Sequence, residues 1–173
     1  MKTSLVIVLI LSAALLGCAS DSNSSAHFNV STVFKSEYCG PASSNPGLNW
    51  LAGPEQWQAY QKRLAADPRV KSESIVSENS KGVLVVSLGQ QISGGYGIDL
   101  GPQAPFIEID GAANRETRTL VIPMTVTEPK PGGMRITVMT QPCIGLAIVS
   151  DHEIGFVKVL SNSATAFEAI RIP

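Results

Sequence analysis

The stretch from Lys81 to Leu100, KGVLVVSLGQQISGGYGIDL, predicts a strand, a glycine-rich loop and a second strand. β-Branched residues are concentrated in the range 83–86, and apolar residues resume at Ile98 after the loop. Glycines allow backbone angles that other residues avoid, so the loop can present the large amphipathic ring of Tyr96 to a partner. The predicted binding loop is Ser93, Gly94, Gly95, Tyr96 and Gly97.

Short predicted strands follow one another on both sides of this loop, with turn residues between them. In the segment 117–127, alternation places Leu120, Ile122, Met124 and Val126 on the core face, and Pro123 indicates an edge strand or a bulge. A hairpin is expected to join this segment to 135–139 through a turn at Pro129–Gly133, as a second exposed loop near the first. The predicted strands are 73–76, 83–88, 97–100, 106–109, 117–127, 135–139, 144–149, 154–160 and 166–172.

One amphipathic helix is predicted before these strands. Gly53 and Pro54 are typical of a helix start, and Asp67-Pro68 ends the helical pattern. Trp57, Tyr60 and Leu64 form one apolar stripe that can dock on a sheet. The segment 40–53 before it is rich in turn residues and predicts irregular structure, with Trp50 as a core residue. The expected fold is therefore mainly β: an antiparallel β-sandwich or barrel-like domain with one N-terminal amphipathic helix packed on it.

The N-terminal residues predict an export signal. A short basic start precedes the apolar run Leu5–Leu16, which is too short to span a bilayer as a helix. Leu15-Leu16-Gly17-Cys18 is similar to the lipobox of bacterial lipoproteins, which implies cleavage before Cys18 and a lipid anchor on it; an ordinary signal peptide with a chance cysteine is the alternative. We therefore expect a signal peptide at 1–17, a lipidated cysteine and disordered tether at 18–27, and a single β-rich domain at 28–173.

The expected location is the bacterial cell envelope, anchored by lipid. Because Ala19 rather than aspartate follows the cysteine, a cell with two membranes should place the protein on the outer membrane, facing the periplasm. The formal net charge is −1 and basic residues do not cluster, so nucleic acid is not an expected partner. The expected contacts are the membrane, through the N-terminal lipid, and a protein.

Two cysteines remain once Cys18 carries lipid. In an exported protein, Cys39 and Cys143 are a predicted disulfide, which would close a long loop between the N-terminal strand and the later sheet. Two separately buried thiols are the alternative. A zinc site is not expected, because too few ligands are present.

The chain offers little for catalysis. The two histidines are His27, at the end of the tether, and His152, in a polar turn with neighbouring acids whose side chains converge poorly on a metal. Ser93 lacks a nucleophile elbow and an evident base, and the acids Glu108 and Asp110 are expected to be solvated. We therefore expect no enzyme activity, no cofactor, no metal and no small-molecule substrate.

The region 82–149 resembles the C-terminal domain of the protease complex subunit PrcB family. The resemblance rests on the glycine–tyrosine loop, on Pro129-Lys130-Pro131-Gly132-Gly133, and on Thr140-Gln141-Pro142-Cys143. Ser93 stands where that family usually has threonine, and Gln91-Ile92 stands where a proline often precedes it. The resemblance implies an accessory subunit that associates with a secreted or surface protease, supports its assembly or stability, and binds through the Gly-Gly-Tyr loop. Pro131, Gly132 and Gly133 would form the second loop of the site.

Two other functions stay open. The Gly-Gly-Tyr loop is also similar to the inhibitory loop of the chagasin family of cysteine-peptidase inhibitors, although the later Arg-Pro-aromatic element of that family has no convincing match. A structural envelope lipoprotein is the third option. An alternative for the loop itself is that Tyr96 folds back and covers the core.

Overall fold

The computed structural model describes residues 27–39, 44–65, 80–110, 117–132, 137–163, 165 and 167–172. The predicted signal peptide, Cys18, the strand predicted at 73–76 and Gly133 lie outside these residues. The elements in chain order are β1 (Phe28–Ser36), β2 (Gly47–Leu51), α1 (Gly53–Ala65), β3 (Gly82–Ser87), β4 (Gly97–Leu100), β5 (Phe106–Asp110), β6 (Thr117–Thr127), β7 (Cys143–Ser150), β8 (Phe156–Ser161) and β9 (Ile170–Arg171).

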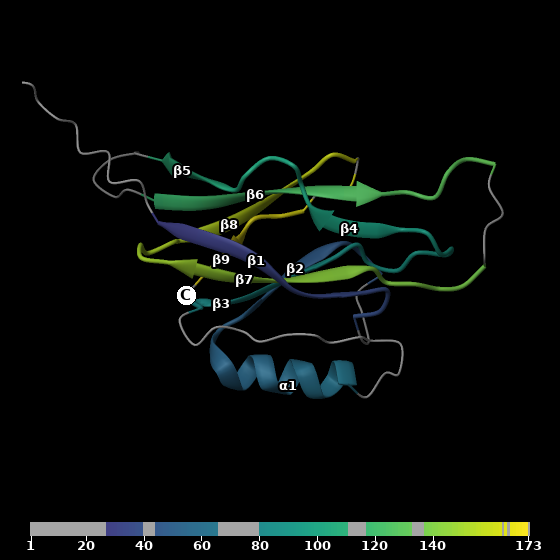
Figure 1. Cartoon of the computed structure of the whole chain (residues 1–173), viewed down its shortest axis with the longest axis horizontal. Coiled ribbons are helices and arrows are strands. Elements are labelled where there is room, and N and C mark those ends of the chain that lie inside the picture. The colour runs from purple at the N-terminus through teal and green to yellow at the C-terminus, as the bar shows by residue number, and fades with distance from the viewer. Residues whose placement is uncertain are drawn as a thin grey trace, which may run out of the picture.

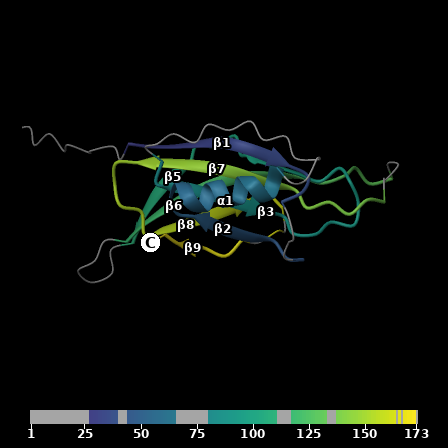
Figure 2. The ribbon, with the colours of Figure 1, turned by 90° about the horizontal axis from the view of Figure 1, so that it is seen from below.

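These strands form two packed sheets, and α1 covers the outer face of the first (Figure 1). The first sheet has the order β1-β7-β3-β2 and is antiparallel throughout. The second has the order β4-β6-β8-β9, with β5 also paired to β6. Figure 2 looks onto the helix side of the first sheet. The predicted fold class is confirmed, as an open sandwich and not a closed barrel.

The main core lies between the two sheets. Alternation along each strand sends one apolar row inward, and Leu120, Ile122, Met124 and Val126 of β6 lie on the predicted core face. They meet Leu84 and Val86 of β3, Ile144, Leu146 and Ile148 of β7, and Val157 and Val159 of β8. Trp50 is buried in the same cluster, as predicted.

A second apolar cluster lies between α1 and the outer face of the first sheet. Trp57, Tyr60 and Leu64 are all buried, which confirms the predicted docking stripe. Burial raises the pKa of Tyr60 to about 12, against a smaller lowering by the nearby Arg63 charge. The ring of Phe34 packs against both aromatic rings of the helix, with centroids 5.8 Å from Trp57 and 5.9 Å from Tyr60.

Phe34 reaches this cluster because β1 carries a bulge. The register of β1 on β7 shifts between Thr32 and Phe34, which turns Phe34 to the helix side, opposite Gly145. A Cβ atom on Gly145 would overlap the Phe34 ring. The absent side chain at position 145 therefore provides the space that the ring occupies.

The structure differs from the sequence prediction in the partners of β6. The expected hairpin between 117–127 and 135–139 is wrong: residues 137–139 form no strand, and β6 pairs with β4, β5 and β8, the last in parallel. Pro123 lies neither on an edge strand nor at a bulge. It lies opposite the gap between β4 and β5, where its carbonyl accepts a hydrogen bond from Gly101 N–H at 2.8 Å, so its missing N–H breaks no pairing with those strands.

Further differences concern the smaller elements. β2 forms in the segment expected to be irregular, because it pairs along its whole length with β3. The last predicted strand, 166–172, is reduced to the two residues of β9. No helix in the described part of the chain is long and apolar enough to cross a bilayer.

Candidate protein-binding site

Three chain segments meet at the end of the sandwich where β3 and β6 finish and β7 begins. They are 88–97, 128–132 and 137–142, on the right in Figure 1. The loop after β3 and the segment before β7 pair through Gln91 and Thr140: Gln91 N–H donates to Thr140 O at 2.8 Å, and Thr140 N–H donates to Gln91 O at 3.0 Å. We call this end of the molecule the tip.

Side chains reinforce this pairing from within. The Thr140 hydroxyl donates to the Ser93 carbonyl at 3.2 Å, and the Gln91 amide nitrogen donates to the Leu88 carbonyl at 3.0 Å. Ser93 and Thr140 are buried. The first half of the predicted binding loop is therefore held in place, and Ser93 supports the loop through its backbone carbonyl.

The glycines of the loop permit close approach between segments. Gly95 has a φ of +91°, and a Cβ there would lie 3.2 Å from Cβ of Pro129; a Cβ on Gly94 would lie 4.0 Å from Val138. The two predicted loops thus lie side by side, which agrees with the sequence expectation. Pro131 and Gly132 form an exposed turn beyond this contact, with Gly132 at a φ of +77°.

Tyr96 is not held out on a bare loop. It is half-buried and packs against the main core cluster beside Ile98, which matches the alternative that the ring folds back over the core. One side of the residue borders a cleft of about 450 Å³ between the end of β1 and β4. An ion pair between Lys35 and Asp99 also lines this cleft and links the two sheets there.

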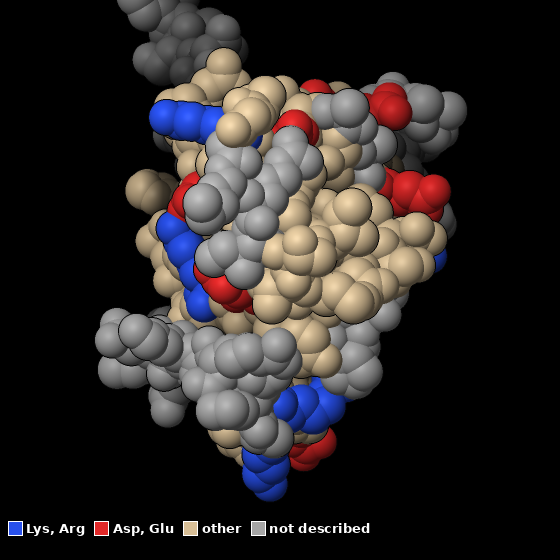
Figure 3. All heavy atoms as spheres, turned by 90° about the vertical axis from the view of Figure 1, so that its right-hand side faces the viewer, with Lys and Arg blue, Asp and Glu red and all other residues tan. Residues whose placement is uncertain are grey.

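The exposed apolar side chains of the tip are Ile92, Val138 and Met139. Their exposed fractions are 80%, 48% and 61%. In Figure 3, which views the molecule from this end, the described residues at the centre and right form an uncharged area with charged side chains at its border. Sequence reasoning did not single these residues out, because 135–139 was assigned to a strand and Ile92 to the approach of the glycine loop. The sequence feature that could have indicated this exposed surface is Ile92, a single apolar residue between the polar Gln91 and Ser93.

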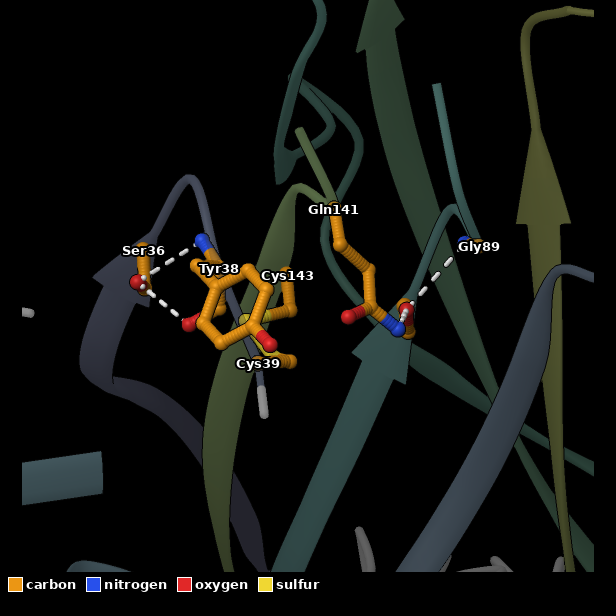
Figure 4. The surroundings of a disulfide bond; sticks show 7 residues. Ser36, Tyr38, Cys39, Gly89, Gln141 and Cys143 are labelled. Atoms are coloured by element: carbon orange, nitrogen blue, oxygen red, sulfur yellow. Dashed lines mark hydrogen bonds between the residues drawn. A yellow bond between two sulfur atoms is a disulfide. The ribbon is translucent and has the colours of Figure 1, made fainter. Parts of the chain in front are cut away.

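The disulfide lies just beneath the tip. The structure joins Cys39 to Cys143, consistent with the predicted bridge, with the Cα atoms 6.0 Å apart (Figure 4). Cys39 follows a short turn in which the Ser36 hydroxyl accepts from Tyr38 N–H at 3.0 Å and donates to the Tyr38 carbonyl at 2.8 Å. Gln141 N–H donates to the Glu37 carbonyl at 2.7 Å. The bridge and these bonds fix the 137–142 segment where it enters β7.

The polar residues considered for chemistry do not gather at one place. His152 lies in a turn where its N–H donates to the Ser150 hydroxyl at 3.1 Å, at the end of the sandwich opposite the tip. Within the described residues, no group of three or more His, Cys, Asp or Glu side chains is arranged to hold a metal. Glu108 and Asp110 are exposed on β5.

The fold and the tip together define a β-sandwich with a helix on one outer face and an exposed apolar end. Comparison of the chain with protein-family models, with curated proteins and with solved structures gave no match. The resemblance to the PrcB C-terminal domain stays a prediction.

Proposed function

We propose that this chain is a lipid-anchored envelope binding protein, an accessory subunit that associates with a secreted or surface protease and supports its assembly or stability. The observation that carries the proposal is the tip, where Ile92, Val138 and Met139 are exposed together on a hydrogen-bonded frame. Apolar side chains grouped on an otherwise polar surface are typical of protein contact sites. Because the Gln91–Thr140 hydrogen bonds already order the tip before a partner binds, binding loses less conformational entropy.

The position of the tip supports the proposal. β1 begins at Phe28, opposite Ser150 at the end of β7, whereas the tip precedes Cys143 at the start of β7. The eight residues of β7 span roughly 24 Å. A domain anchored through Cys18 would therefore hold the tip on the side away from its attachment, facing a partner rather than its own membrane.

The structure changes which residues should carry the contact. Tyr96 is half-buried against the core, so its ring supports the loop from below. Ile92 is the most exposed large apolar side chain of the described residues and lies in the Gln91–Thr140 frame. In this proposal the glycines and Tyr96 set the shape of the binding loop, and Ile92, directly before the loop, makes the contact.

The test compares native-envelope pull-downs by the wild-type lipoprotein, Ile92→Asp and the control Leu160→Asp, with the eluates assayed for peptidase activity. Leu160 is also exposed, at 41%, but lies on β8 opposite Pro123 of β6, outside the three segments that form the tip. We expect an active protease to co-elute with wild type and with the control, and its recovery to fall at least about tenfold with Ile92→Asp, as for the loss of a central apolar contact.

The other outcomes separate the remaining functions. A protease that co-elutes in a silenced form would support the chagasin-like inhibitor instead. Recovery of the same non-protease envelope proteins by all three baits would contradict the proposal and favour a structural envelope lipoprotein.

The lipid anchor has its own test. Intact-mass measurement of the mature protein is expected to show loss of residues 1–17 and a gain of acyl mass on Cys18. Cys18→Ala should abolish the added mass and release the protein from the membrane fraction. A mature protein with an unmodified Cys18 would contradict the anchor.

A further inference from the structure

The β5 strand presents a free backbone edge. Among the described strands it pairs only with β6, and its other side has no strand partner. Four of its five residues are exposed, including Phe106 at 41% and Ile109 at 61%. A strand edge of this kind exposes N–H and C=O groups that can pair with an added strand.

Within the described part of the chain, features that hinder strand addition lie at the other strand edges of the sandwich. β1 carries its bulge and the ion pair from Lys35 to Asp99, and that same ion pair covers β4. β2 contacts β9 of the opposite sheet, and β9 itself has two residues. β5 has no bulge, no proline and no lysine, and the charged side chains that it carries are the two acids Glu108 and Asp110.

The side chains of β5 indicate what kind of strand would fit. Phe106, Glu108 and Asp110 lie on the outer face of the sheet, and Ile107 packs toward the core. An antiparallel copy of β5 centred on Glu108 would set that carboxylate directly against its own equivalent, which is destabilising. A strand with lysine or arginine opposite the two acids would instead gain favourable cross-strand pairs. The existing Lys158–Glu108 pair, at 3.8 Å and half exposed, leaves the carboxylate accessible.

We propose that β5 is a second binding site, which takes up an extended segment of a partner protein as an additional antiparallel strand. The segment alternates basic and apolar residues, with its basic side chains against Glu108 and Asp110 and an aromatic or aliphatic residue against Phe106. Main-chain hydrogen bonds supply the affinity and the two acids set the selection. This site is separate from the tip and does not depend on the proposed function.

The probe is a capped peptide, Thr-Lys-Val-Lys-Val-Phe-Thr, which places lysine opposite both acids in the antiparallel register. Binding is measured by calorimetry on the full mature chain, and hydrogen exchange locates the site. We expect slower exchange across residues 106–110. Two further peptides have the same sequence with backbone N-methyl groups. One is methylated on the odd-numbered residues and the other on the even-numbered residues. In strand addition one set of N–H groups faces β5, so one methylated peptide should bind at least tenfold more weakly and the other nearly as well as the parent.

Reversing the charge at position 108 tests whether the two acids select a basic partner segment. Glu108→Lys should weaken the parent peptide at least tenfold and favour Thr-Lys-Val-Glu-Val-Phe-Thr, in which glutamate faces the new lysine. The matched control Glu55→Lys makes the same charge change in the exposed first turn of α1 and should leave both affinities unaltered. Equal binding of both methylated peptides, equal effects of the two charge variants, or no binding at millimolar peptide would overturn the proposal. A concentration-dependent dimer abolished by Glu108→Lys would also overturn it, with a second copy as the occupant.

Discussion

Replacing Gly145 by alanine is expected to lower the free energy of unfolding by about 3 kcal/mol. The new methyl group would overlap the buried ring of Phe34, which cannot move toward the helix because Trp57 and Tyr60 pack against it there. Equilibrium denaturant unfolding of wild type and variant, both carrying Cys18→Ser to omit the lipid, measures the change.

Two companion variants show whether the Phe34 ring is the cause. Gly47→Ala is the matched control, because a Cβ there meets no atom within 4 Å, and it should change stability by less than about 0.5 kcal/mol. Adding Phe34→Leu to Gly145→Ala should recover part of the loss, so that the two changes together cost at least about 1 kcal/mol less than their sum. A Gly145→Ala protein as stable as the Gly47→Ala protein would contradict this account of the bulge.

Removal of the disulfide is expected to have the other large effect. Cys39 and Cys143 are 104 residues apart in sequence, and the loop-entropy model gives about 4.7 kcal/mol as an upper figure for such a bridge. The double variant Cys39→Ala, Cys143→Ala should therefore unfold at distinctly lower denaturant than its parent. Both proteins again carry Cys18→Ser.

Reduction supplies the control for this prediction. Dithiothreitol should destabilise the parent by a similar amount and leave the double variant unaffected. Thiol labelling of the unreduced parent in denaturant should find both cysteines blocked. Two labelled thiols in that sample would show that the bridge is absent from the isolated protein.

The elements that could be predicted from the sequence are those in which apolar residues recur at a regular spacing. The stripe of Trp57, Tyr60 and Leu64 predicted the helix, and the alternation along 117–127 predicted the core face of β6, because burial on one side leaves a periodic pattern. β2 has no such pattern. Its segment follows prolines and serines, and it is a strand because β3 beside it offers backbone partners, which is a property of the tertiary structure.

The two predicted loops lie side by side in the structure, but the side chain most exposed there is Ile92 and not Tyr96. Glycines around Tyr96 indicated an unusual backbone, and the structure confirms a positive φ at Gly95. Whether the ring points to solvent or to the core depends on the neighbouring strands, because Tyr96 packs against residues distant in sequence. Ile92 and Met139 became neighbours of the site through the Gln91–Thr140 pairing, and no local pattern encodes that pairing.

The pairing of β1 with β7 also sets the order in which the domain can fold. Phe28, at the start of the domain, is opposite Ser150, and β8 must still return to lie parallel with β6 in the other sheet. Neither sheet can be completed from the N-terminal half alone, and such non-local topologies typically fold on the order of milliseconds to seconds. A chain that emerges from a translocation channel beginning with its N-terminus would remain unfolded until nearly all of it has crossed. For a chain exported as proposed, this strand arrangement would delay closure of the domain until the chain reaches the compartment in which its cysteines can be oxidised.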